Sequence, residues 1–202
     1  ASAKMGGKVV SGVATCSNVR AWYMDDDVEG DCREKHVKHG DMGKSAVGAE
    51  ELAALGVLHW SLSGEEHDKD LETIRAARGY NFKDIIRVSP ETMPNYEQKL
   101  AAFYEEHMHS DEEIRYVMDG SGYFDVRDAA DQWIRIDCRK GDLIILPEGM
   151  YHRFTVDTGN YAKAMRLFIG EPVWTPLNRP QEEHESRLKY KRQFLVETPA
   201  AL

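Results

Sequence analysis

The pattern of apolar and polar positions changes near residue 106. Beyond that point, short runs rich in β-branched and aromatic residues alternate with Gly, Asp, Asn and Pro, which are turn signals. Closely spaced short strands of this kind are typical of an antiparallel sheet folded into a barrel or jelly roll. The predicted strands are residues 114–118, 123–127, 133–136, 143–146, 152–156 and 162–169.

The part of the chain before this change has helical periodicity. Residues Lys69–Arg78 place Leu71 and Ile74 at helical spacing, and Gly79 follows at the position that commonly ends a helix. The other elements predicted here are a helix between Ser45 and Gly56, a helix over residues 95–105, and a short strand over residues 21–24.

These patterns predict a mainly β fold with N-terminal helices, organised as an antiparallel β-barrel of the jelly-roll type. A chain of 202 residues can bury one good core and fits one domain better than two. We expect that domain over residues 21–180. Residues 1–20 are small, polar and unpatterned, which is typical of a disordered leader, and residues 181–202 form a polar, helical tail.

Composition and charge exclude several classes of partner. A net charge of −9 argues against nucleic acid and anionic membranes, and no apolar run reaches the length of a membrane-spanning helix. The three cysteines have no CxxC spacing, as expected for reduced thiols in a cytoplasmic protein that can also be nuclear. We expect a monomer with no nucleic-acid partner and no membrane insertion.

Two histidines and a glutamate between residues 107 and 113 have the spacing of a metal site. In an extended strand, side chains at i and i+2 share a face, so His107 and His109 can bind one ion. On a helix the same pair would diverge by more than half a turn. Glu113 lies an even number of residues after His109, so in an extended strand it would share the same face. Two imidazoles and one carboxylate are the ligand set of non-haem iron oxygenases, which keeps coordination positions open.

A fourth candidate ligand, His152, follows a buried strand and a turn that contains Pro147 and Gly149. A returning antiparallel strand can place His152 opposite the first three ligands. Three neutral imidazoles and one carboxylate would leave a divalent ion with a net charge of about +1, which attracts an anionic oxygen ligand. A chance set of structural histidines is the alternative, and the length of the joint pattern favours the metal site.

The two stretches resemble the motifs of the cupin superfamily. His107, His109 and Glu113, followed by Gly120, match the core of the first motif, although Ala101 stands where glycine is usual. Residues 141–152 match the second motif, with Val156 in place of the usual asparagine. These departures lie outside the four candidate ligands, so the resemblance implies a cupin barrel that holds one metal ion.

Within the cupins, the chain is similar to the acireductone dioxygenase family over residues 21–180, in its eukaryotic form. The segments that carry this resemblance are residues 22–26, 55–58, 103–107, 113–116, 119–128, 151–155 and 165–174. The family acts in methionine salvage on 1,2-dihydroxy-3-keto-5-methylthiopentene (acireductone) and O2. The resemblance implies Fe(II) or Ni(II), one per monomer. The iron form yields 2-keto-4-methylthiobutyrate and formate, and the nickel form yields methylthiopropionate, formate and carbon monoxide.

The resemblance also implies substrate-binding roles for Arg115, Phe154, Arg166 and Trp174, and a catalytic role for Arg115. Taken alone, Arg115 fits a surface salt bridge equally well, and Phe154 and Trp174 fit a barrel core. Arg166 is more unusual, because it interrupts an apolar run and an unpaired buried arginine is costly.

Two other functions are compatible with a cupin metal site. One is a cupin enzyme for a different substrate, such as a thiol or flavonol dioxygenase or a sugar isomerase. The other is an interaction or regulatory protein in which the metal is structural. A metal with open coordination positions would argue against the second, because structural sites are usually closed.

Overall fold

The strand β5 (Glu113–Arg127) is the central element of the fold, because its two halves belong to two different sheets. The first half pairs with β7 (Asp142–Leu146) and β9 (Ala162–Phe168). The second half pairs with β6 (Trp133–Arg139) and β8 (His152–Val156). In this computed structural model the described residues are 10, 13, 18–25, 30–38 and 46–195.

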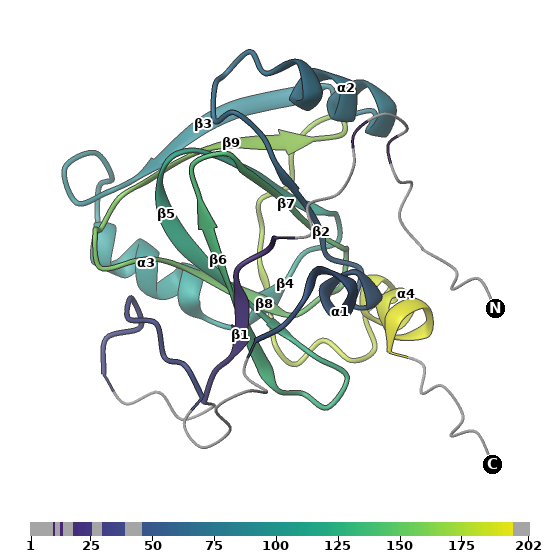
Figure 1. Ribbon diagram of the computed structural model, residues 1–202. Coiled ribbons are helices and arrows are strands. Elements are labelled where there is room, and N and C mark those ends of the chain that lie inside the picture. The colour runs from purple at the N-terminus through teal and green to yellow at the C-terminus, as the bar shows by residue number, and fades with distance from the viewer. Residues whose placement is uncertain (1–9, 11–12, 14–17, 26–29, 39–45, 196–202) are drawn as a thin grey trace.

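Outer strands extend both sheets, and every pairing is antiparallel. One sheet has the order β2-β7-β5-β9-β3, and the other has the order β1-β6-β5-β8-β4-β10. The two sheets curve around a common interior (Figure 1), which confirms the predicted antiparallel barrel. The outer strands are β1 (Ala21–Tyr23), β2 (Leu58–Ser61), β3 (Phe82–Val88), β4 (His107–Met108) and β10 (Leu177–Asn178).

The change of sheet in β5 occurs at a glycine. The register shifts between Val117 and Asp119, and Gly120 has a φ of 70°, in the left-handed region. A Cβ atom at Gly120 would lie 2.2 Å from the carbonyl oxygen of Tyr161. This position therefore requires glycine, and the two strands predicted over residues 114–118 and 123–127 are one continuous strand.

Helices cover the outside of the barrel and largely follow the predicted pattern. The helix α2 (Lys69–Arg78) has the predicted bounds, because Asp68 caps its first amides and Gly79, at φ 78°, ends it. The predicted cap of α1, Ser45, lies outside the described residues. The other helices are α1 (Ala49–Ala54), α3 (Tyr96–Tyr104) and α4 (Glu185–Phe194).

The structure has two strands before residue 106 that the sequence pattern did not predict. Between the helices, β2 and β3 add edge strands to the first sheet. The burial of β3 does not alternate cleanly along the strand, so the segment carries little of the period-two signal that predicts a strand. As a result, the wall that β3 contributes to the interior was missing from the predicted barrel.

The segments predicted as leader and tail contribute to packing where they are described. Val10 and Val13 are buried, and the Val13 carbonyl accepts a hydrogen bond from the indole of Trp60. In α4, Tyr190 is buried and donates its hydroxyl proton to the carbonyl of Leu55. Most of residues 1–20 lie outside the described residues, as do residues 196–202. Within the described part, no helix is both long enough and apolar enough to cross a membrane.

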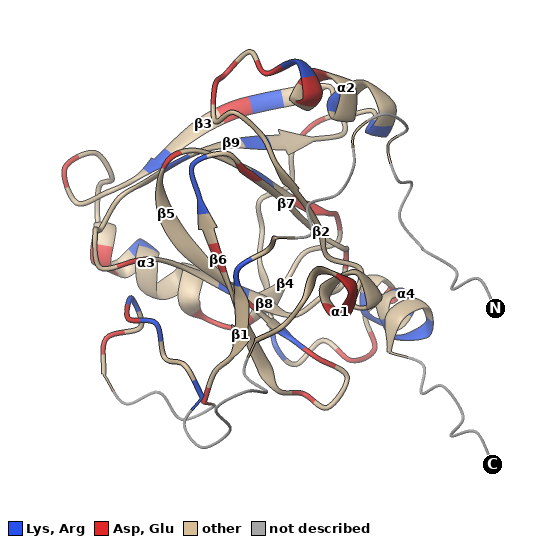
Figure 2. Cartoon of the chain, viewed as in Figure 1, with Lys and Arg blue, Asp and Glu red and all other residues tan. Residues whose placement is uncertain are grey.

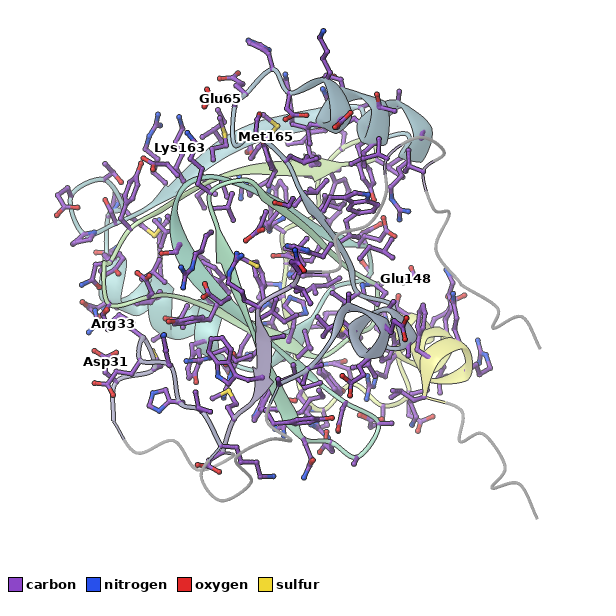
Figure 3. All side chains as sticks on the ribbon, in the orientation of Figure 1. Asp31, Arg33, Glu65, Glu148, Lys163 and Met165 are labelled. Atoms are coloured by element: carbon purple, nitrogen blue, oxygen red, sulfur yellow. The ribbon has the colours of Figure 1, made fainter. Side chains whose placement is uncertain are left out.

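Successive side chains of β5 point to opposite faces of the sheet, one toward the apolar core and the other toward the site. Ile114 and Tyr116 belong to an apolar cluster that includes Leu71 and Ile74 of α2. Glu113 and Arg115, at the intervening positions, line an interior cavity instead. Figure 3 draws the side chains on both sheets, and the cavity is lined by side chains from both of them.

Candidate active site

A cavity of about 340 Å³ inside the barrel collects all the site residues predicted from the sequence. They come from strands β4, β5, β8 and β9 and from the segments that follow β4 and β9. Sequence reasoning therefore placed these side chains in one site, although they span residues 107 to 174. The predicted residues that line the cavity are His107, His109, Glu113, Arg115, His152, Phe154, Arg166 and Trp174.

The three histidines meet because β4 and β8 are paired strands. His107 and His152 are direct partners in the register of these strands, and His109 lies two residues beyond His107. Their ring centroids are 4.6 Å (His107–His152), 5.1 Å (His107–His109) and 5.4 Å (His109–His152) apart. One nitrogen atom from each ring lies within 4.8 Å of the others, so the rings can share one ion.

Backbone carbonyl groups fix the tautomers of the three rings. The Nδ1 atom of His107 lies 2.6 Å from the carbonyl oxygen of Glu105, and that of His152 lies 2.9 Å from that of Met150. For His109 the corresponding carbonyl belongs to Thr175, at 3.3 Å. A carbonyl only accepts hydrogen bonds, so each Nδ1 carries a proton, and in a neutral ring Nε2 then keeps a free lone pair.

The environment keeps at least two of the rings neutral. Burial and the neighbouring His107 lower the pKa of His152 to about 3, and burial also lowers the pKa of His107. The Nε2 atom of His152 is buried and has no hydrogen-bond partner among the described residues. A buried polar atom without a partner is costly unless something else, such as a metal ion, binds it. The donor set therefore fits a divalent transition metal.

Glu113 lies beside the three rings and is held by an arginine. One carboxylate oxygen is 3.6 Å from Nε2 of His109 and 2.9 Å from a terminal guanidinium nitrogen of Arg115. Burial would raise the pKa of Glu113, but Arg115 and the imidazoles outweigh it, and the pKa lies below its usual value. Glu113 is therefore anionic and lies next to His109, although the donor atoms that lie within 4.8 Å of one another are those of the three histidines.

Arg166 and Trp174 line the cavity in contact with each other. The Arg166 guanidinium carbon lies 4.1 Å from the centroid of the Trp174 ring, and that of Arg115 lies 5.6 Å from it. Trp174 also contacts Phe82 and Phe168, with ring centroids 6.2 Å and 5.7 Å away. The indole is thus held between cations and other aromatic rings.

Apolar side chains make up the remaining wall, and sequence reasoning missed most of them. Phe154 contacts Phe103 and Phe124, with ring centroids 6.4 Å and 4.9 Å away. Alternate residues of β3, Ile86 and Val88, also face the cavity. The sequence of residues 82–88 lacks the clean period-two pattern that would have found them. Further apolar residues in the lining are Ala102, Val117, Cys138, Ala162, Ala164 and Pro176.

An antiparallel barrel with three converging imidazoles and a carboxylate at one cavity defines a metal-binding cupin. An acireductone dioxygenase from Bacillus anthracis, solved with a cadmium ion in its active centre, has a similar fold. The TM-score is 0.60 at 22% sequence identity, and the alignment covers 82% of this chain and 99% of that one. This likeness confirms the predicted fold.

Curated relatives are much closer in sequence. Acireductone dioxygenase 1 of Physcomitrium patens is 57% identical over 88% of this chain and 90% of its own length. The human acireductone dioxygenase is 56% identical over 89% of this chain and 99% of its own length. The sequence model of the ARD/ARD' family matches residues 20–176. This chain belongs to the ARD/ARD' family, and the predicted class of metal-dependent dioxygenase is confirmed.

Proposed function

We propose that this chain oxidises acireductone with O2, with one Fe(II) or Ni(II) ion held by His107, His109, Glu113 and His152. The observation that carries the proposal is the orientation of the three rings, whose Nδ1 atoms are turned to backbone carbonyls while the rings line one largely apolar cavity. A structural metal would need a closed shell. Here the donor atoms face a cavity of about 340 Å³, which has room for a small substrate.

The ion would supply Lewis acidity that favours the anionic enediolate form of the substrate. The chain supplies the other requirements. Arg115 donates a hydrogen bond to the carbonyl of Ile114 and contacts Glu113, so its charge is fixed beside the donor set. An anionic substrate oxygen would accept a charge-assisted hydrogen bond from Arg115.

The apolar walls orient the rest of the substrate and exclude water. Phe103, Phe124 and Phe154 form a cluster at the cavity, and a methylthio group packs favourably against aromatic rings. A dry cavity strengthens the interaction between Arg115 and an anion, because the local dielectric constant is low. The cavity therefore fits a substrate that has an anionic end near Arg115 and an apolar thioether end near the aromatic rings.

The experiment compares apo-protein with protein reloaded anaerobically with Fe(II) or Ni(II), and measures O2 uptake with acireductone. We expect turnover only after metal is added. His152→Ala should lose most of the bound metal and the turnover together, while His67→Ala, at an exposed histidine outside the cavity, should keep both. Full metal content and turnover in His152→Ala would contradict the proposed ligand set.

A further inference from the structure

A row of charged side chains runs across three neighbouring strands at the cavity. Asp84 of β3 is the register partner of Arg166 of β9, and Arg166 is the register partner of Arg115 of β5. Asp84 has the same parity along β3 as Ile86 and Val88, which line the cavity. Figure 2 shows that β3 carries both acidic and basic positions.

The row leads from the surface toward the candidate metal ligands. The exposed fraction of the side chains falls from 35% at Asp84 to 21% at Arg166, 15% at Arg115 and 11% at Glu113. Asp84 is therefore the outermost member and Glu113 the innermost. No prediction from the sequence included Asp84, which lies 82 residues before Arg166.

Two arginines side by side need two carboxylates. Like charges on directly opposite strand positions repel each other. Glu113 pairs with Arg115, and Asp84 pairs with Arg166 through both carboxylate oxygens. Burial and Arg166 lower the pKa of Arg115, whereas Glu113 and Asp84 act in the opposite direction. The charge of Asp84 is thus felt at Arg115 as well as at its direct partner.

The Asp84 contact also fixes the orientation of the guanidinium group. The Nε atom of Arg166 donates to one oxygen of Asp84 at 2.7 Å, and a terminal nitrogen donates to the other oxygen. Such a bidentate pair fixes the plane of the group. Arg166 also lies 4.1 Å from the centroid of Trp174, which sits outside any strand in the segment between β9 and β10.

We propose that Asp84 is a positioning residue of the substrate cavity: it holds Arg166 against Trp174 and thereby keeps the indole in the cavity wall. Its effect on substrate binding rests on the proposed function, whereas its effect on Trp174 does not. Loss of Asp84 would leave Arg166 free to turn away from the indole. Arg166 would also compete with Arg115 for Glu113, the nearest remaining carboxylate in the row.

A charge effect and a positioning effect predict opposite results for Asp84→Asn. Removing a negative charge near the cavity would by itself favour an anionic substrate and lower KM. Releasing Arg166 and Trp174 would raise KM. We expect a rise of about tenfold in KM with kcat changed less than about twofold, the size of effect that a lost cation–π and ion-pair contact produces.

The first measurement uses apo-protein and needs no turnover. Acrylamide quenching of tryptophan fluorescence is measured in wild type and in Asp84→Asn, each with and without Trp174→Phe, so that the difference isolates Trp174. We expect Trp174 to be more accessible in Asp84→Asn and Arg166→Lys, and close to wild type in Asp84→Glu. Glu72→Gln removes a carboxylate that contacts Arg75 on α2, away from the cavity, and should change nothing.

Unchanged quenching of Trp174 in both Asp84→Asn and Arg166→Lys would overturn the proposal. A fall in KM in Asp84→Asn, or an equal rise in KM in the Glu72→Gln control, would also overturn it. The double variant Asp84→Asn/Arg166→Lys should be no worse than either single variant, because both break the same contact. If wild type does not turn over acireductone, the proposed function fails while the quenching result still decides the role of Asp84.

Discussion

The pair between Glu113 and Arg115 makes a sharp prediction about stability. The two side chains are 11% and 15% exposed, and their charged atoms are 2.9 Å apart. Replacing Glu113 with glutamine keeps the volume but leaves the buried guanidinium without its counter-charge. Breaking a fully buried pair costs about 3–5 kcal/mol, and partial exposure should reduce the loss to about 2–3 kcal/mol in the apo-protein.

The double variant separates the pair from the metal. Glu113→Gln/Arg115→Met removes both charges and puts an unbranched apolar side chain in place of the arginine. We expect its apo-protein to regain most of the lost stability, because no unpaired charge remains. Metal affinity should stay low in both variants, since the carboxylate is missing from the donor set.

The assay is urea denaturation of metal-free protein at neutral pH, read as a double-mutant cycle. The expected coupling energy is about 2 kcal/mol, because the residues are in direct contact. Apo Glu113→Gln as stable as wild type, or two single effects that simply add, would refute the reasoning. In either case Glu113 would not be held by Arg115 before metal binds.

His152, Gly120 and Trp174 each give a further prediction. Because the pKa of His152 is about 3 in the folded protein and 6.5 is its ordinary value, the unfolded chain takes up the proton first. The apo-protein should therefore keep the full contribution of His152 above pH 6.5 and lose about 1.4 kcal/mol per pH unit as the pH falls toward 3. Urea denaturation at pH 7 and pH 5 checks this. An equal change in the free energy of unfolding with pH in wild type and in His152→Gln would contradict it. Gly120→Ala should lower the melting temperature markedly, since its Cβ would meet the Tyr161 carbonyl at 2.2 Å; an unchanged melting temperature would show that the strand can shift. Trp174→Ala should raise KM more than it lowers kcat, and a loss confined to kcat would show that the indole does not bind substrate.

The candidate metal ligands could be predicted from local signals, whereas the roles of the substrate residues came from the family resemblance. In an extended segment, the spacing of His107 and His109 puts both rings on one face, where they can bind one metal ion. The turn before His152 belongs to a single contiguous motif. The structure then brings the stretches together through one register pair, His107 with His152. The fold class followed in the same way from the spacing of short strands and turns.

The parts that could not be predicted depend on distant or backbone contacts. Arg166 was recognised as unusual in an apolar run, but its partner Asp84 lies in a strand that the sequence pattern did not reveal. The tautomer of His109 depends on the carbonyl of Thr175, and a backbone acceptor has no sequence signature. The burial of Val10 also depends on tertiary packing that local periodicity does not contain.

The most direct test of the central claim is product analysis with one chain and two metals. Apo-protein is loaded with either Fe(II) or Ni(II), given acireductone and O2, and its products are identified. We expect 2-keto-4-methylthiobutyrate and formate with iron, and methylthiopropionate, formate and carbon monoxide with nickel. Fully metallated protein that consumes no O2 with acireductone would contradict the proposed function and leave only the cupin metal site.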